Sequence, residues 1–328
     1  MQRHRQMEII STAGILLISW IILTILDVAI SGMAALIFRT AFRKVFLWGL
    51  LSLAVPPVLM AYGILIERNI FVVKDVEVTF EDLPTEFDGY RIVHLSDIHA
   101  RSFEKRERSL SRAVKKINRQ EADLIAFTGD LVTLSPDELD NLSGILGGLH
   151  AEDGIVSVLG NHDYGIYAHG ETGIAPEKAV EDLMMRQKTM GWDILVNDSR
   201  IIRRGKDSVA VVGVENTSAS SHFPSRGDLG RASEGTEGVF RILLSHDPTH
   251  WEMEILGKDY PLTLSGHTHA MQFSIFGWSP SRFIFRQNKG LYSNGRQYIY
   301  VNTGLGETIF PARIGTPPEI TVITLKRV

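Results

Sequence analysis

The sequence predicts an α/β fold with a buried sheet for residues 69–328, which follow a membrane anchor in residues 1–68. The chain is mostly apolar up to about Ile66, and charged and turn-forming residues then appear at the density of a soluble domain. In this second part, short apolar segments alternate with helical patterns at 104–120 and 136–149. Near-continuous apolar strands between helices are typical of α/β folds with buried sheets.

Composition excludes several kinds of function. The formal net charge of −4 argues against a general nucleic-acid partner, because proteins that bind nucleic acids usually carry more basic than acidic residues. The chain has no cysteine, so disulfides, thiolate metal sites and cysteine nucleophiles are excluded. Any metal must therefore be held by imidazole, carboxylate or amide groups, and 11 histidines are present. The sequence leaves the oligomeric state open.

Two apolar runs predict a transmembrane helical hairpin, at about 9–30 and 45–66. Asp27 is the only charge in the first run, and the second has none. Each run is long enough to cross a hydrocarbon core of about 30 Å as a helix. Pro56 and Pro57 are expected to kink the second helix. A cleaved signal or a pair of buried core helices is the alternative, although the first run is long for a signal.

The basic residues near these runs do not fix their orientation. The loop between the runs carries Arg39, Arg43 and Lys44, and a similar number of basic residues flanks the hairpin on the other side. The positive-inside rule needs a clear imbalance between the two sides. The side of the membrane that carries the soluble domain is left undecided.

The soluble part begins with an alternating segment, 71–80, that predicts a strand. Further short apolar segments, each a predicted strand, lie at 91–96, 123–128, 154–159, 208–214, 240–245, 261–265, 298–302 and 319–325. The later segments follow one another without long helices between them. A second sheet packed on the first is therefore expected.

Five of these predicted strands end in residue types that bind metals. The sequences that follow them are Asp97-Ile98-His99, Gly129-Asp130, Gly160-Asn161-His162-Asp163, His246, and Gly266-His267-Thr268-His269. In open α/β sheets, ligands bind beyond the carboxyl ends of the strands. Any one of these groups alone would be read as a turn or a cap. Five of them in one chain predict a metal site.

The chemistry of these groups narrows the choice of metal. The candidate ligands are Asp97, His99, Asp130, Asn161, His246, His267 and His269. Imidazoles mixed with carboxylates and an amide suit Mn²⁺, Fe²⁺ or Zn²⁺ better than Ca²⁺. The set is too large for one such ion and is sufficient for two divalent ions that share a bridging carboxylate.

The motifs DIH, GDL, GNHD, a lone His and GHTH, in this order, resemble those of the calcineurin-like metallophosphoesterase superfamily. The tail at 302–320 resembles its membrane-associated bacterial phosphodiesterase branch. The resemblance implies a four-layer αββα sandwich, with two mixed sheets flanked by helices, and a location at the bacterial inner membrane. Carried over by position, Asp97, His99, Asp130 and His269 would hold one metal, and Asp130, Asn161, His246 and His267 the other.

The function that this resemblance implies is hydrolysis of a phosphomonoester or phosphodiester by metal-activated water. Lipid-linked and nucleotide-linked esters are candidate substrates. His162 is the expected proton donor to the leaving group, and Asp163 is expected to orient it. Tyr164, Tyr167 and His169 are candidate substrate contacts. For His162 the alternative is a further ligand or a turn residue, and for the substrate contacts it is a simple loop.

Two other functions stay open at this point. One is a non-catalytic metal-binding membrane scaffold of the same fold, and the other is a phosphoprotein phosphatase. The chain also departs from the related bacterial enzymes after the GHTH motif, where they usually continue with Gly-Gly-Gln and this chain has Ala270-Met271-Gln272. The turn beside the ligands, and with it the substrate pocket, is therefore expected to differ.

The remaining histidines divide by position. His94 lies inside an apolar strand and is expected in the core. His150, His222 and His250 lie in predicted loops or helix starts and are expected at the surface.

Overall fold

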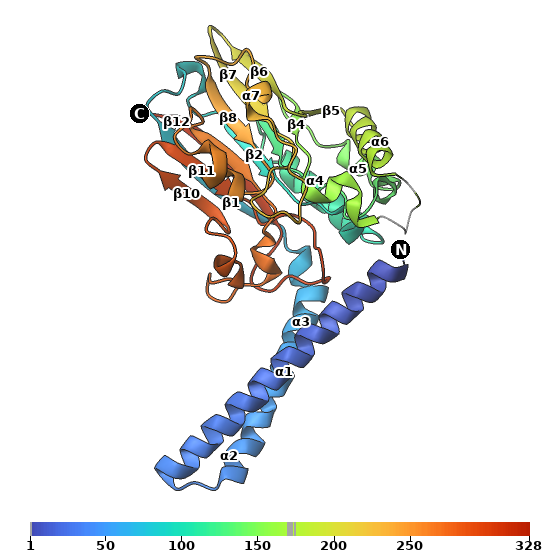
Figure 1. The fold of residues 1–328 in the computed structure, drawn as a ribbon, viewed down its shortest axis with the longest axis vertical. Helices are drawn as coiled ribbons and strands as arrows, with labels where there is room; N and C mark the ends of the chain where they lie inside the picture. The colour runs from blue at the N-terminus through green and yellow to red at the C-terminus, as the bar shows by residue number, and fades with distance from the viewer. Residues whose placement is uncertain (1, 169–172, 174) are drawn as a thin grey trace.

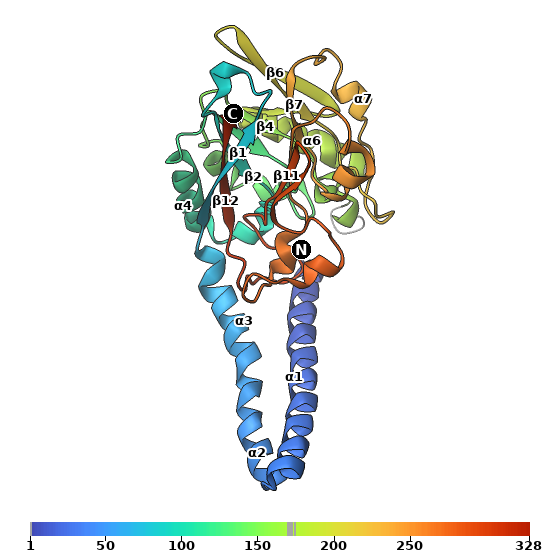
Figure 2. The ribbon, with the colours of Figure 1, turned by 90° about the vertical axis from the view of Figure 1, so that its left-hand side faces the viewer.

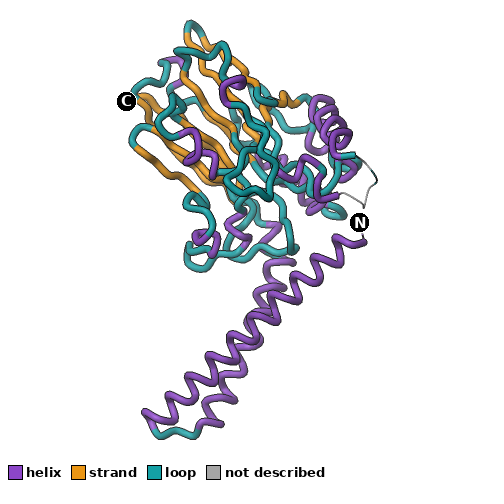
Figure 3. The backbone as a smooth tube through the Cα atoms, in the orientation of Figure 1, coloured by secondary structure: helices purple, strands orange, loops and turns teal. Residues whose placement is uncertain are grey.

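The computed structural model describes residues 2–168, 173 and 175–328. Two layered sheets form the body of the molecule, and a pair of long helices projects from one end of it (Figure 1). The helices are α1 (Gln2–Phe38), α2 (Phe42–Gly49), α3 (Val55–Leu65), α4 (Glu107–Asn118), α5 (Ser143–Leu146), α6 (Pro176–Thr189) and α7 (Leu229–Ala232). Figure 3 shows that strands fill the centre of the body and helices lie outside them.

The projecting pair is a helical hairpin. Residues Glu8–Phe38 and Phe42–Asn69 form two helical stretches that are long and apolar enough to cross a membrane, with mean hydropathies of 2.5 and 2.0. The second stretch changes to a 3-10 helix at Leu50–Ala54, and α3 then begins with prolines in its first turn. A proline lacks the N–H that a helix interior needs, and the first turn of a helix tolerates its absence. The kink expected at Pro56 and Pro57 stays a prediction.

The hairpin helices contact each other through small and polar groups. The indole Nε1 of Trp20 donates a hydrogen bond to the carbonyl of Leu53 at 2.8 Å. Asp27, the only charged residue of the first apolar run, is buried against Gly49, where an added Cβ would lie 1.7 Å from the Asp27 Oδ1. Small residues allow this close approach of two helices in an apolar environment.

The first sheet has the strand order β1-β12-β2-β3-β4-β5. Its strands are β1 (Val72–Phe80), β2 (Arg91–Leu95), β3 (Leu124–Phe127), β4 (Ile155–Ser157), β5 (Trp192–Ile194) and β12 (Glu319–Arg327). β2, β3, β4 and β5 are parallel, and β12 pairs antiparallel with β2. The sheet is therefore mixed, with its parallel part formed by strand–helix alternation.

The second sheet has the order β10-β11-β9-β8-β7-β6. Its strands are β6 (Asp198–Arg204), β7 (Asp207–Gly213), β8 (Phe240–Leu244), β9 (Leu262–Ser265), β10 (Gly290–Asn294) and β11 (Gln297–Val301). β7, β8, β9 and β11 are parallel, and β6 and β10 form antiparallel edges. This sheet is the one expected from the later apolar segments.

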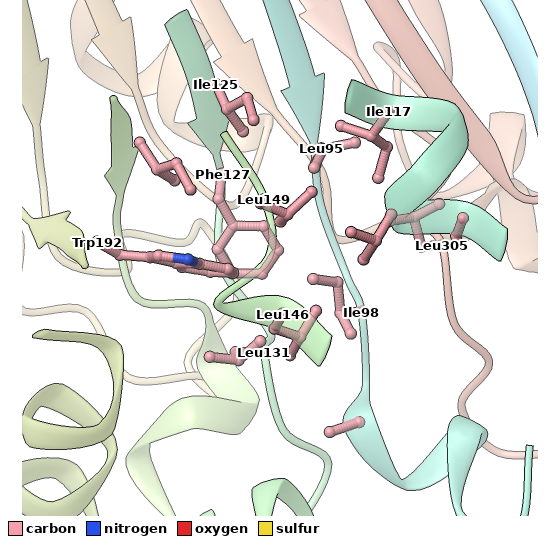
Figure 4. Packing of buried hydrophobic residues seen from close by; sticks show 14 of the residues in the cluster. Leu95, Ile98, Ile117, Ile125, Phe127, Leu131, Leu146, Leu149, Trp192 and Leu305 are labelled. Atoms are coloured by element: carbon pink, nitrogen blue, oxygen red, sulfur yellow. The ribbon is translucent and has the colours of Figure 1, made fainter. Parts of the chain in front are cut away.

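Alternating side chains of the two sheets build three apolar layers. Ile92 and Leu124 of the first sheet pack with Ile242 and Leu262 of the second in the layer between the sheets. Figure 4 shows the outer layer of the first sheet, where Leu95 and other strand residues face Ile117 of α4. The outer face of the second sheet packs against α7 and the residues around Trp251–Ile255. The four-layer αββα architecture is thus confirmed.

One helical prediction was only partly correct. The segment 136–149 forms two short pieces, Pro136–Leu139 and α5, instead of one helix. Gly144, Gly147 and Gly148 lower the helix propensity of its second half.

Candidate metal centre

The carboxyl ends of five parallel strands meet at one edge of the two sheets. β2, β3 and β4 are neighbours in the first sheet, and β8 and β9 are neighbours in the second. The loops that leave these five ends carry all seven residues expected to bind metal. Side chains far apart in the sequence are therefore brought together.

The first group comprises Asp97, His99 and His269. The Nε2 atoms of His99 and His269 lie 3.1 Å apart, and the Nε2 of His269 is 3.2 Å from Oδ1 of Asp97. All three side chains are buried. Their nitrogen and oxygen ligand atoms lie within 4.8 Å of one another. Such a convergence of imidazole and carboxylate ligands fits a divalent cation.

The second group comprises Asn161, His246 and His267. Oδ1 of Asn161 lies 2.8 Å from Nδ1 of His267 and 3.1 Å from Nε2 of His246. These two ring nitrogens are 3.3 Å apart. One amide oxygen and two imidazole nitrogens thus point at a common position, as ligands of one cation would.

Asp130 lies between the two groups. Its Oδ2 is 3.6 Å from Nε2 of His99, on the side of the first group. The same oxygen is 3.2 Å from Nε2 of His246, on the side of the second. Asp130 is the one carboxylate of the ligand set placed within 4 Å of ring nitrogens of both groups.

Many of the candidate ligands have a strained backbone. A positive φ is adopted by Asp97 (50°), His99 (42°), Asp130 (57°), His267 (72°) and His269 (48°). A residue with a Cβ in this region costs of order 1–3 kcal/mol and persists only where the surrounding structure holds it. Such strain clusters at functional sites. Here it falls on five of the seven candidate ligands.

Glycines beside the ligands make room for the carboxylates. A Cβ on Gly160 would lie 2.2 Å from Oδ1 of Asp130, and one on Gly266 would lie 2.3 Å from Oδ2 of Asp97. Gly129 has a φ of +95° and would meet the backbone of Gly160 at 2.4 Å. The glycines of the GD, GN and GH motifs therefore serve the close approach of backbone to ligand side chains.

The electrostatics of the cluster also fit a cation. Nδ1 of His246 donates to the carbonyl of Thr128 at 2.7 Å, so Nε2 faces the ligand cluster. Burial opposes protonation of this ring, but the adjacent Asp130 carboxylate outweighs burial and raises the pKa of His246 to about 10. The buried Asp130 carboxylate thus favours a positive charge beside it. A divalent ion supplies that charge.

His162 lies at the edge of the ligand cluster and is partly exposed. Its Nδ1 hydrogen-bonds the carbonyl of Thr133 at 2.8 Å. Because a carbonyl only accepts, Nδ1 carries the proton and Nε2 is left for other chemistry. The ring packs against His99 and Tyr167, with centroids 4.9 Å and 4.4 Å away. His162 also belongs, with His99 and Asp130, to a group that could hold a metal.

Asp163 contacts the backbone of the ligand loops. Its carboxylate accepts hydrogen bonds from the N–H groups of Asp130, Leu131, Val132 and Gly160 at 2.8–3.1 Å. Burial and the Asp130 carboxylate raise the pKa of Asp163 to about 7, while the N–H donors oppose this shift. In the structure the His162 ring bonds to Thr133, and the Asp163 carboxylate bonds to backbone N–H groups. The expected pair between Asp163 and the His162 ring stays a prediction.

The three candidate substrate contacts have different positions. Tyr167 is 37% exposed, and its hydroxyl accepts a hydrogen bond from Nδ2 of Asn161 at 3.0 Å. Tyr164 is buried, and its hydroxyl contacts Glu215, so the structure does not bring it to the ligand cluster. His169 lies outside the described residues.

Several residues that support the ligands were missed by sequence reasoning. The carboxylate of Asp247 is 3.7 Å from Nε2 of His267, and Thr133 Oγ1 is 3.3 Å from Nδ1 of His99. The buried Arg313 lies 3.3 Å from Nδ1 of His269, and Gly304 packs on Asp97. Only Asp247 had a sequence signal, because it directly follows a ligand. Groups that contact the outer nitrogens of metal-binding histidines fix the orientation of the rings.

The histidines outside the ligand set gave a mixed result. His94 is fully buried and pairs with Thr128, so its expected place in the core is confirmed. The surface position expected for His250 was wrong. It is 1% exposed, and its two ring nitrogens contact Ser245 and Glu254. A polar side chain can be buried where both of its nitrogens find partners.

Comparisons with known proteins found relatives of this chain. The uncharacterized metallophosphoesterase YkuE of Bacillus subtilis is 32% identical over 252 residues, which span 74% of this chain and 82% of YkuE. A zebrafish (Danio rerio) transmembrane protein with metallophosphoesterase domain is 32% identical over 290 residues, spanning 84% of this chain and 62% of that protein. The sulfate thiohydrolase SoxB of Thermus thermophilus gives a TM-score of 0.44 at 14% identity over 74% of this chain and 57% of SoxB.

The apolar helical hairpin and the zebrafish relative together suggest membrane anchoring. Residues 90–271 match the family described as calcineurin-like phosphoesterase, and this range contains all seven candidate ligands. The family implies divalent metal ions, and the structure supplies clustered ligands for them. The chain therefore belongs to the calcineurin-like phosphoesterase family and is a metal-dependent phosphoric ester hydrolase.

Proposed function

We propose that the chain holds two divalent ions and hydrolyses a phosphomonoester or phosphodiester with a water molecule. The observation that carries this proposal is the position of Asp130, whose Oδ2 lies within 3.6 Å of His99 Nε2 and 3.2 Å of His246 Nε2. Asp97, His99 and His269 would complete one ion's ligands, and Asn161, His246 and His267 those of the other. The mixture of imidazole, carboxylate and amide suits Mn²⁺, Fe²⁺ or Zn²⁺.

The ions supply Lewis-acid activation of water and of the phosphoryl oxygens. The chain's own residues orient the reacting groups and transfer protons. His162 sits beside the ligands with Nδ1–H fixed on Thr133, so that Nε2 is the atom able to carry a second proton. In the reaction, the water oxygen forms a bond to phosphorus while the P–O bond to the leaving group breaks. The leaving oxygen takes a proton from Nε2 of His162. A proton from the attacking water then protonates His162 again.

We further propose that residues 1–68 anchor a catalytic domain of residues 69–328 in a bacterial inner membrane. The two apolar stretches and the zebrafish transmembrane relative support the anchor, and the relative in Bacillus subtilis supports a bacterial source. Protease accessibility in intact cells measures which side the catalytic domain faces.

The test uses the purified full chain loaded with Mn²⁺. Hydrolysis of bis(p-nitrophenyl) phosphate and of p-nitrophenyl phosphate is followed by the release of nitrophenolate, and bound metal is counted by elemental analysis. We expect two ions per chain and turnover of at least one ester. Inactivity on both esters with two ions bound would favour a non-catalytic scaffold. A single ion per chain would contradict the bridging role of Asp130.

A further inference from the structure

A large groove connects the metal centre to the membrane hairpin. Its volume is about 1070 Å³, just above the range of about 300–1000 Å³ that is usual for small-molecule sites. At one end it is lined by the ligands His99, Asp130, Asn161 and His267. At the other it is lined by residues of α1 between Ile15 and Leu23 and of the second hairpin helix between Val55 and Met60. One continuous surface thus runs from the candidate ligands to the helices.

Contacts between the hairpin and the domain fix this arrangement. The carbonyl of Pro311 accepts a hydrogen bond from Arg68 at 3.2 Å, and a Cβ on Gly63 would lie 2.8 Å from the carbonyl oxygen of Arg313. The segment with η9 (His269–Gln272) and η10 (Pro280–Phe283) lies at the end of the body nearest to α1 and α3 (Figures 1 and 2). The groove is therefore walled by the domain on one side and by the hairpin on the other.

Beyond the candidate metal ligands and His162, the wall of the groove is mostly apolar, with Ser19, Thr268, Gln272 and Thr308 as polar members. Ile22, Leu59, Phe285 and Ile314 are among the side chains that line it. Among the described residues that line the groove, none is a lysine or an arginine. A free nucleotide or a phosphorylated protein segment would place polar groups against this wall without partners, which is unfavourable. A hydrocarbon chain would bury apolar surface along it.

Two groove residues hold apolar side chains at a cost in backbone strain. Met271 has a φ of 53° and Ile309 a φ of 65°, and both line the groove. A left-handed conformation costs about 1–2 kcal/mol for a residue with a Cβ, and it is a marked outlier for a β-branched one. The chain thus keeps an apolar side chain at the groove where glycine would be unstrained.

We propose that the substrate is a lipid phosphate ester whose phosphate lies at the metal centre and whose hydrocarbon chain lies in this groove. The chain of the lipid would then pass between α1 and α3 and enter the bilayer around the hairpin. This proposal rests on the proposed function, because it names the substrate class of the same site. Its basis is the continuity of one apolar groove with the candidate ligands at one end and with two membrane-length helices at the other.

The first test compares p-nitrophenyl phosphodiesters that carry a methyl or an octyl group. The full Mn²⁺-loaded chain is assayed in nanodiscs, and kcat/KM is measured for both esters. We expect the octyl ester to be preferred by at least about tenfold, since several methylenes become buried. Equal kcat/KM values would overturn the lipid proposal and leave the phosphoesterase function standing. Inactivity on both would overturn the proposed function.

A pair of matched variants tests the groove itself. Met271→Gly removes apolar surface from the groove and also relieves a left-handed residue, so its effect cannot be assigned to added strain. Phe276→Gly is the control, because Phe276 also has a positive φ of 49° and is fully exposed but does not line the groove. We expect the octyl-to-methyl ratio to fall about fivefold or more in Met271→Gly and to persist in Phe276→Gly. An equal fall in both variants would show general membrane adhesion and overturn the groove as the binding site.

A labelling experiment gives a readout that does not depend on turnover. The ligand is a hexadecyl phosphate ester with a photoreactive diazirine at the far end of its chain. We expect crosslinks in the peptides that contain Ile15–Leu23 and Val55–Met60, and fewer of them in Met271→Gly. Labels spread evenly along the hairpin to its turn at 39–41, without change in Met271→Gly, would show bulk lipid contact and contradict the proposal.

Discussion

The carboxylate of Asp163 accepts a hydrogen bond from the backbone N–H of Asp130 at 2.8 Å. The same carboxylate oxygen accepts from the N–H of Gly160 at 2.9 Å. The loop after β3 and the loop after β4 are thus joined through one buried side chain, although 33 residues separate Asp163 from Asp130. The position of the candidate bridging ligand therefore depends on a residue that does not itself face the ligand cluster.

Asp163→Asn is expected to weaken this connection. An amide keeps one oxygen acceptor but places an NH₂ group against N–H groups that need an acceptor, and such a loss costs about 1.5–3 kcal/mol for a charged partner. We expect a lower free energy of unfolding in denaturant titration and fewer bound ions at a fixed Mn²⁺ concentration. Wild-type stability together with full metal content would contradict the role assigned to these hydrogen bonds.

His162→Ala is expected to separate proton donation from metal binding. Metal content should stay at the wild-type level, while turnover of an ester with a poor alkyl leaving group should fall about 10²–10⁴-fold. The loss should be much smaller for bis(p-nitrophenyl) phosphate, because nitrophenolate leaves without a proton. A parallel loss of metal and activity would instead make His162 a ligand, the role its place beside His99 and Asp130 also allows.

The candidate ligands could be predicted from the sequence because each lies within four residues after the end of an apolar strand. Parallel strands put their carboxyl ends at one edge, so the order of the motifs was enough to predict that Asp97 and His267 would lie in one site. The two-sheet architecture was readable for the same reason. His94 was assigned to the core because its strand neighbours are apolar.

The supporting residues were not readable in this way. Arg313 reaches His269 from a segment without regular structure, and the partners of Asp163 are backbone groups that any residue could supply. His250 was expected at the surface because its sequence neighbours do not show that Ser245 and Glu254 pair with its ring. These two partners allow the ring to be buried. The groove combines a helix near the N-terminus with loops near the C-terminus, and that proximity comes from tertiary packing alone.

Asp130→Asn is expected to remove the link between the two ligand groups. Its Oδ2 faces ring nitrogens of both groups, and an amide has one neutral oxygen in place of two anionic ones. Elemental analysis should then find at most one ion per chain, with turnover near background. Asp259→Asn is the control and should keep both ions, because Asp259 is exposed and precedes β9, at the opposite end of that strand from the loop that carries His267. Two bound ions and normal activity in Asp130→Asn would remove the main support for the dinuclear proposal.

Gly266→Ala tests whether a ligand carboxylate needs the space left by a missing side chain. The added Cβ would lie 1.8 Å from Oγ of Ser96 and 2.3 Å from Oδ2 of Asp97, so both side chains must leave their present positions. We expect the affinity for Mn²⁺ to fall about 10–100-fold, the range found when groups that support ligands are disturbed.

Gly144→Ala is the matched control, because a Cβ there meets nothing within 4 Å and lies in α5. It should keep the metal affinity and raise the unfolding free energy by up to about 1 kcal/mol. Wild-type affinity for Mn²⁺ in both variants would contradict this prediction. It would show that the close fit between Gly266 and Asp97 is not needed for metal binding.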